Sequence, residues 1–194
     1  MHKRTYYIVN GITLYRMIAA PLLLLLIIRH QPEIFKWLLA ISFLTDAIDG
    51  FLARRYKVIS ILGAKLDSIA DDLTIAVAII GMIVFKPEFL RQEVTLVILL
   101  LALFVLQTSF AVVRYGKMSS FHTYAAKTAA ILQGIFLQLL FFLDGPVYLL
   151  FYITAAVTAI ELVEEIILVL MLSQWKTDVK GLYWVIRWRQ SERS

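Results

Sequence analysis

The chain has 194 residues, 61% of them hydrophobic, and a net charge of +5. A soluble domain averages about 45–50% apolar residues, so this composition excludes an ordinary soluble protein and predicts an integral membrane protein. Cysteine is absent, which excludes a disulfide framework and thiol chemistry. We expect one domain over residues 1–194, without a cleavable signal peptide, because the first apolar run lacks a small-residue cleavage site.

Six apolar stretches are each long enough to cross a bilayer as a helix, which takes roughly 20 residues. In chain order they cover residues 8–28, 34–53, 61–85, 94–113, 121–143 and 147–172. The basic and aromatic residues 1–9 predict an N-terminal interfacial helix, and the basic, tryptophan-containing tail 173–194 predicts a surface segment. The fold class is therefore all-α integral membrane, with six transmembrane helices.

Three local features qualify this outline. Pro21 lies inside the first stretch and predicts a kink there. The sequence KPEFLRQE at 86–93 is polar and predicts a loop, and Asp144-Gly145-Pro146 predicts a tight turn.

Lysine and arginine predict the orientation. Of the 19 basic residues, four belong to the connections expected on one side of the membrane, namely Arg29, Lys36, Lys86 and Arg91, and the others belong to the opposite side, which also holds both termini. By the positive-inside rule, both termini are expected to be cytoplasmic. In a bacterium, the protein would then lie in the cytoplasmic (inner) membrane.

Aspartates interrupt the second and third apolar stretches. On a helix, Asp46 and Asp49 share one face with Gly50 and Ala53, and Arg54 lies at the edge of that face. A carboxylate in a bilayer is costly and therefore suggests a metal site, an ion path or a proton relay. The two residues fall in the cytoplasmic half of their stretch.

The third stretch repeats this arrangement. Asp67 and Asp71 are one helical turn apart, and Gly63 lies one turn before them. Two such helices placed face to face would form a four-carboxylate cage with space beside it for a ligand. Hard oxygen ligands of this kind suit Mg²⁺ or Mn²⁺.

The spacing of these residues resembles a known family. The pattern Asp-x2-Asp-Gly-x2-Ala-Arg-x8-Gly-x3-Asp-x3-Asp is complete in residues 46–71, and it is similar to that of the CDP-alcohol phosphatidyltransferases. The resemblance implies transfer of a phosphatidyl group from CDP-diacylglycerol to a small alcohol, with release of CMP. It implies two Mg²⁺ or Mn²⁺ ions held by Asp46, Asp49, Asp67 and Asp71, with Asp71 also acting as the catalytic base. It further implies that Gly50, Ala53, Arg54 and Gly63 bind the CDP-lipid, and that the protein forms a homodimer in the bilayer without a nucleic-acid partner.

The acceptor alcohol is less well defined. DGFLARR followed by LGAKLD is most similar to the members that use glycerol 3-phosphate, which is therefore the first expectation. Many of those members carry Asp-Pro-x-Ala-Asp-Lys at residues 67–72, and this chain lacks both the proline and the lysine. Serine, inositol phosphate and phosphatidylglycerol remain open as acceptors. Asp72 lies outside the motif.

Two groups of polar residues are weaker candidates. Asn10, Thr13 and Arg16 lie within one broad helical face and could line the cavity near the substrate phosphates, or Arg16 could extend outward to the headgroups. The second group could bind a phosphate of the acceptor or could be ordinary loop charge; its members are Arg114, Lys117, His122 and Lys127.

Other polar residues interrupt the later stretches. Glu161, Glu164 and Glu165 share a helical face. They are expected to pair with Arg16 or Lys127, or to shape the acceptor pocket. Interhelical hydrogen bonds are expected for Gln107, Gln133 and Gln138.

Two other classes of protein remain as alternatives. A divalent-cation transporter would carry polar residues through to the outer face, and the outer halves of these stretches are almost purely apolar. A structural scaffold would leave the intramembrane acids unexplained.

Overall fold

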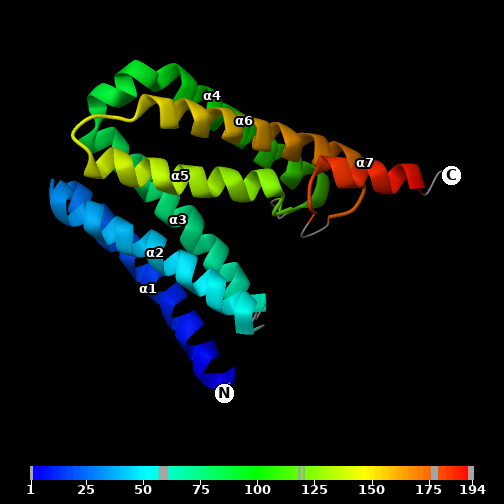
Figure 1. The fold of residues 1–194 in the computed structure, drawn as a ribbon, viewed down its shortest axis with the longest axis horizontal. Helices are drawn as coiled ribbons and strands as arrows, with labels where there is room; N and C mark the ends of the chain where they lie inside the picture. Colours follow the sequence, from blue (N-terminus) through cyan, green and yellow to red (C-terminus); the bar gives the residue numbers. More distant parts are fainter. Residues whose placement is uncertain (1, 57–60, 118, 120, 176–178, 192–194) are drawn as a thin grey trace. The chain divides into compact units, whose positions relative to one another are not determined.

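The computed structural model describes the backbone of residues 2–56, 61–117, 119, 121–175 and 179–191. Within these ranges it describes the side chains except those of residues 2–10, 13, 47, 49–56, 61–68, 71–72 and 189–191. The described residues form seven α-helices and no strand (Figure 1). The helices are α1 (His2–Ile28), α2 (Pro32–Tyr56), α3 (Ile61–Phe85), α4 (Pro87–Tyr115), α5 (Tyr124–Phe142), α6 (Tyr148–Met171) and α7 (Leu182–Ser191).

The N-terminal part of the prediction is wrong in one respect. A separate interfacial helix was expected over residues 1–9, but α1 is one continuous helix from His2 to Ile28. Gly11 is the one strong helix-weakening residue before Pro21, and a single glycine costs only about 1 kcal/mol in a helix. The helix also continues through Pro21.

The predicted loop at 86–93 is also wrong. Helix α4 begins at Pro87, directly after α3, and runs for 29 residues. Proline is favoured at the first position of a helix because its φ is already helical and its missing N–H would have no partner there. Glu88 in the first turn adds a favourable interaction with the helix dipole. The polar composition of this segment therefore marks the exposed start of a helix.

The ends of α4 and α5 follow from local chemistry. Gly116 adopts a φ of +67°, and its N–H donates to the carbonyl of Val112 over 2.8 Å, which ends α4. After α5, the chain bends at residues 143–145, which confirms the turn expected at Asp144-Gly145-Pro146.

The chain divides into two compact units. The first contains Met1–Leu90 and Leu137–Asp144. In it, α1 packs against both α2 and α3. Phe35 is fully buried, and its ring makes edge-on contacts with Phe85 and Phe141 at centroid distances of 5.3 and 5.1 Å. This aromatic cluster joins α2, α3 and the end of α5.

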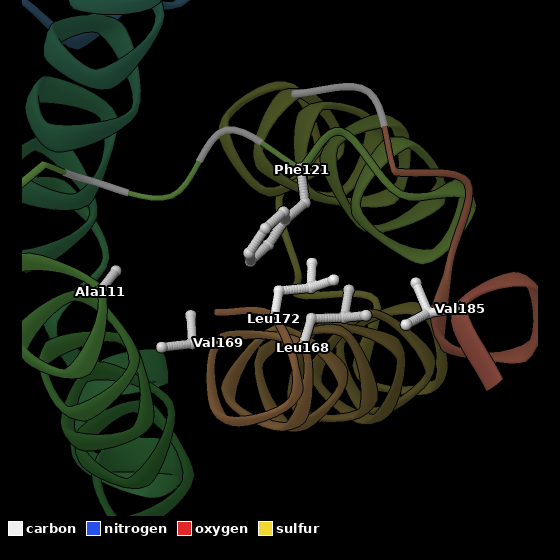
Figure 2. Close-up of a cluster of buried hydrophobic side chains, with 6 residues drawn as sticks. All are labelled: Ala111, Phe121, Leu168, Val169, Leu172 and Val185. Atoms are coloured by element: carbon white, nitrogen blue, oxygen red, sulfur yellow. The ribbon is translucent and has the colours of Figure 1, made fainter. Parts of the chain in front are cut away.

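The second unit contains Arg91–Phe136 and Gly145–Ser194. Its hydrophobic cluster joins the end of α4, the segment before α5, the end of α6 and α7 (Figure 2). The cluster consists of Ala111, Phe121, Leu168, Val169, Leu172 and Val185. Val185 therefore attaches the C-terminal helix to the rest of this unit.

Within the described part of the chain, α4 and α5 are long and apolar enough to cross a membrane. Helix α4 leaves many large apolar side chains exposed, including Ile98 at 59% and Val105 at 61%. A water-soluble surface rarely carries such a continuous apolar stripe, whereas lipid accommodates it. The fold supports a membrane protein, and the count of six spans and the orientation stay predictions.

Candidate functional site

One candidate site residue from α1 meets one from α2. The Nη1 atom of Arg16 lies 2.8 Å from Oδ1 of Asp46, in a hydrogen-bonded ion pair. The Arg16 side chain is only 2% exposed, so the alternative in which it extends outward to the headgroups is wrong. Asp46 remains 39% exposed, so its carboxylate can still take a further ligand.

The other motif residues lie on helices as the spacing requires. Helix α2 continues unbroken through Asp49 to Arg54, and α3 continues through Gly63, Asp67 and Asp71. The three- and four-residue spacings therefore correspond to turns of a helix. The side chains of the other predicted site residues on α1, α2 and α3 lie outside the described part of the structure. These residues are Asn10, Thr13, Asp49, Gly50, Ala53, Arg54, Gly63, Asp67 and Asp71.

A metal site is consistent with the donor chemistry of the motif. Four carboxylates supply the hard oxygen ligands that Mg²⁺ and Mn²⁺ prefer. Among the side chains that the structure describes, no three acidic or histidine residues gather around one point. Of the four motif aspartates, only Asp46 has a side chain that the structure describes. The convergence of the four carboxylates on one metal site therefore stays a prediction.

A second polar centre lies in the other unit, around Glu165 of α6. Its Oε2 accepts hydrogen bonds from Nε2 of Gln107, over 2.5 Å, and from Oγ of Ser119, over 2.6 Å. Glu165 is 8% exposed, and a buried carboxylate is stable only when its oxygens are satisfied in this way. The contact joins α6 to α4 and to the segment between α4 and α5.

The neighbouring glutamate holds the C-terminal helix. Oε1 of Glu164 accepts the backbone N–H of Leu182 over 2.8 Å, which satisfies one of the free N–H groups at the start of α7. Gly181 has a φ of +148°, and a Cβ there would lie 3.0 Å from that oxygen. A glycine is therefore required for both the backbone conformation and the close approach.

Burial and helix capping position the side chains of the segment before α5. Phe121 and Thr123 are fully buried, and the Oγ1 of Thr123 accepts the N–H of Ala126 over 3.1 Å as the N-cap of α5. His122, between them, has a φ of +50° and is exposed. His122 is thus an exposed residue between two buried ones.

A pocket of about 210 Å³ opens at this point. His122, Tyr124, Lys127 and Lys180 line it. The backbone N–H of Tyr124 donates to the carbonyl of Lys180 over 3.2 Å, and Nζ of Lys127 lies 5.7 Å from the centre of the Tyr124 ring. Two lysines and a histidine around one opening favour an anionic ligand.

The other basic candidates lie elsewhere. Nε of Arg114 donates to the carbonyl of Leu172 at the end of α6, where it stabilises the helix C-terminus. Nζ of Lys117 lies 5.1 Å from the centre of the Trp175 ring. The structure therefore places Lys127 at the pocket and gives Arg114 a structural contact.

The predicted pairings in the later helices are partly confirmed. Gln107 bonds to Glu165, and Gln133 donates to Thr158 Oγ1 over 2.9 Å, so both glutamines join helices. Nε2 of Gln138 is buried and has no hydrogen-bond partner among the described residues, so that expectation is wrong. Glu161, Glu164 and Glu165 were expected to pair with Arg16 or Lys127, or to shape the acceptor pocket. Glu164 and Glu165 accept hydrogen bonds from neutral donors, and Arg16 pairs with Asp46, so the pairing with Arg16 is wrong for these two glutamates.

Sequence reasoning missed two pocket residues, Tyr124 and Lys180. Lys180 lies 53 positions after Lys127, in a tail whose charge predicted only a membrane surface segment. No spacing signal connects the two lysines, because they meet through the fold of α6 and α7.

The chain also matches a family of known proteins. The family model described as CDP-alcohol phosphatidyltransferase matches residues 6–173. The chain is similar to the CDP-diacylglycerol–inositol 3-phosphatidyltransferase of Saccharomyces cerevisiae, with 38% identity over 43% of this chain and 38% of that protein. It is similar to a probable phosphatidylglycerophosphate synthase of Mycobacterium tuberculosis, with 30% identity over 72% of this chain and 68% of that one.

A third relative is a cardiolipin synthase (CMP-forming) of Streptomyces coelicolor, with 38% identity over 50% of this chain and 46% of that protein. Two of these three matches thus span less than half of the relative's own length. The names of the three relatives differ in the product that they make. No solved structure matches the chain.

Proposed function

The chain belongs to the CDP-alcohol phosphatidyltransferase family, and from this premise we propose that it transfers a phosphatidyl group from CDP-diacylglycerol to the hydroxyl of a small alcohol. The observation that carries the proposal is the complete aspartate motif, which lies on two helices of one unit and includes the partly exposed Asp46 in an ion pair with the buried Arg16. Such a pair is what a site for a strongly anionic substrate needs, because it fixes the carboxylate while adding a compensating positive charge.

The reaction needs a base and a means of stabilising negative charge. In the proposed step, Asp71 takes the proton of the acceptor hydroxyl, and the acceptor oxygen forms a bond to the lipid-side phosphorus. The bond from that phosphorus to the bridging oxygen breaks, and CMP leaves with the electron pair. Asp46, Asp49, Asp67 and Asp71 would hold divalent cations, which supply neutralisation of the diphosphate when bound.

Other motif residues would position the CDP-lipid. Gly50, Ala53 and Gly63 lack side-chain bulk and leave room for the nucleotide, and Arg54 would bind a phosphate. Asn10, Thr13 and Arg16 lie on α1, which packs against both motif helices. We propose that these α1 residues border the same cavity.

The proposed acceptor is glycerol 3-phosphate. This choice is supported by the similarity to a protein named probable phosphatidylglycerophosphate synthase, which extends over 72% of this chain and 68% of that protein. Inositol phosphate is the second candidate. We place the enzyme in the cytoplasmic membrane, as a homodimer, with the site open to the cytoplasm.

The test is an assay of the purified protein in detergent or nanodiscs. CDP-diacylglycerol and Mg²⁺ or Mn²⁺ would be combined in turn with glycerol 3-phosphate, inositol phosphate, serine and phosphatidylglycerol, and CMP release would be measured. Release that depends on glycerol 3-phosphate supports the proposal. Release with another acceptor corrects the acceptor, and no release with any of them contradicts the proposed function.

A further inference from the structure

Helix α7 has one side that packs on the second unit and one side that faces away from it. Val185 is 7% exposed and lies in the hydrophobic cluster with residues from the ends of α4 and α6 (Figure 2). The N–H of Leu182 donates to Glu164 of α6 over 2.8 Å and fixes the start of the helix. An apolar and a polar contact therefore determine which side of α7 is presented to its surroundings.

The side that faces away is rich in aromatic residues. Tyr183, Trp184, Ile186 and Trp188 are between 40% and 63% exposed. Trp184 and Trp188 are one helical turn apart, so their side chains share one side of α7. A surface in water rarely gathers so many large apolar side chains in so short a segment, which indicates that a partner covers them.

This aromatic face lies at the end of a helix that can cross a membrane. Helix α5 is long and apolar enough to do so, and it begins at Tyr124. The Tyr124 N–H donates to the carbonyl of Lys180 over 3.2 Å, and the rings of Tyr124 and Trp184 lie 5.4 Å apart between centroids. The start of α7 is therefore level with the start of α5. Tryptophan and tyrosine are enriched at this depth, where the apolar layer of a membrane meets its headgroups.

The exposed charges beside the aromatic face are positive. Lys127, Lys180 and Arg187 are exposed. Glu165 is buried and Glu164 is half-buried, and both carboxylates accept hydrogen bonds from within the unit. Exposed rings beside cations match an anionic phospholipid surface, since the rings enter the boundary of the acyl chains and the cations reach the headgroup phosphates. A second copy of α7 fits less well, because two positive faces repel each other.

We propose that α7 binds anionic phospholipids at the membrane surface, with Trp184 and Trp188 in the interfacial layer and Lys180 and Arg187 beside the headgroup phosphates. The ligand is a lipid and not a soluble phosphate. The inference uses contacts of the second unit alone and does not rest on the proposed reaction. It gives a lipid class and a set of contact residues to a tail whose sequence predicts only a surface segment.

The experiment measures which lipid touches the two tryptophans of α7. The full-length variant Trp37→Phe/Trp175→Phe keeps Trp184 and Trp188 as its only tryptophans. It would be placed in nanodiscs of phosphatidylcholine that contain a minor fraction of brominated phosphatidylglycerol or of brominated phosphatidylcholine, because bromine quenches tryptophan fluorescence on contact. We expect stronger quenching by phosphatidylglycerol, which gives its association constant relative to phosphatidylcholine.

Substitution of the cations tests the charge contribution. Lys180→Gln and Arg187→Gln should each lower the relative association constant about fivefold, the factor that corresponds to about 1 kcal/mol for one cation near an anionic surface. Raised salt should lower it as well, because ions screen exposed charges. Arg91→Gln is the matched control: Arg91 is an exposed cation in the first turns of α4, whereas Ala111, which belongs to the cluster with α7, lies near the end of that helix. This control should keep the preference.

Four results would overturn the inference. Absence of quenching by either lipid would show that the aromatic face does not touch lipid, and unquenched fluorescence that varies with protein concentration would assign the face to a second copy of the chain. Equal quenching by both lipids would show contact without selection for charge. A preference that Lys180→Gln and Arg187→Gln leave at the level of Arg91→Gln would exclude these cations. None of these measurements involves CMP release, so the proposed reaction and this inference can fail separately.

Discussion

Arg16 of α1 and Asp46 of α2 form an ion pair of 2.8 Å in which the arginine is almost fully buried and the aspartate is partly exposed. The pair joins the first helix to the first aspartate of the family motif. A buried guanidinium is costly without a carboxylate, so the two side chains are energetically linked. This link ties folding of the first unit to the geometry of the proposed metal site.

The first prediction concerns the stability of this pair. Asp46→Asn removes a carboxylate from the buried Arg16 guanidinium and should lower the free energy of unfolding by about 1–3 kcal/mol, less than for a fully buried pair because Asp46 is 39% exposed. The double variant Arg16→Met/Asp46→Asn should recover much of that loss, because no buried charge remains. Denaturant titration in micelles measures both.

A matched control lies on the same helix. Lys36 and Glu33 form an ion pair of 2.6 Å, but Glu33 is 77% exposed. Glu33→Gln should therefore cost less than about 1 kcal/mol. Equal losses of unfolding free energy in Asp46→Asn and Glu33→Gln would show that the burial of Arg16 does not determine the cost of breaking its ion pair.

The second prediction concerns the catalytic base. Asp71→Asn removes the group that takes the proton of the acceptor hydroxyl, so CMP release should fall by at least about 100-fold, the lower end of the usual contribution of general base catalysis. Asp72→Asn alters the adjacent carboxylate outside the motif and should retain most activity. Initial rates at saturating CDP-diacylglycerol measure both. Full activity in Asp71→Asn would rule out this assignment.

The third prediction concerns divalent cations. Removal of metal by EDTA should abolish CMP release, and Mg²⁺ or Mn²⁺ should restore it, because the diphosphate needs neutralisation in a low-dielectric site. Asp67→Asn should shift the metal-dependence curve to higher concentration, since one oxygen ligand is weakened. Activity that persists in EDTA after dialysis would contradict a metal site at the aspartates.

The fourth prediction concerns packing in the first unit. A Cβ at Gly81 would lie 2.5 Å from Cζ of Phe35, whose ring is held between Phe85 and Phe141. Gly81→Ala should therefore lower the free energy of unfolding by about 1–3 kcal/mol, the usual cost of overpacking. Thermal unfolding monitored by circular dichroism would show the loss.

Gly134 of α5 provides the control for this substitution. It lies inside a helix, and a Cβ added there would have no described neighbour within 4 Å. Gly134→Ala should be neutral or stabilising, by up to about 1 kcal/mol, because alanine favours the helix. Phe35→Leu in the Gly81→Ala background should recover stability. If both glycine variants behave alike, helix propensity and not the Phe35 contact determines the outcome.

Most helices could be predicted from the sequence, because an apolar run of transmembrane length is recognised from its own residues without any tertiary contact. The third stretch, 61–85, coincides with α3, and the others differ from their helices mainly at the ends. The start of α4 was missed because Pro87 and the polar residues after it indicate a loop in isolation, although proline equally begins a helix. The early start of α1 was missed because basic and aromatic residues mark an interface without marking a helix end.

The sequence by itself determined that Asp46, Asp49, Asp67 and Asp71 recur at helical spacing, because this spacing is a local property that needs no tertiary contact, and it predicted the metal chemistry from their carboxylates. Only the tertiary structure decided that Arg16 faces inward to Asp46, and that Glu164 and Glu165 bring the segments of His122 and Lys180 to one pocket. Those contacts join residues 18 to 58 positions apart. Side-chain hydrogen bonds at such separations depend on how helices pack, and no periodic pattern in the chain encodes that packing.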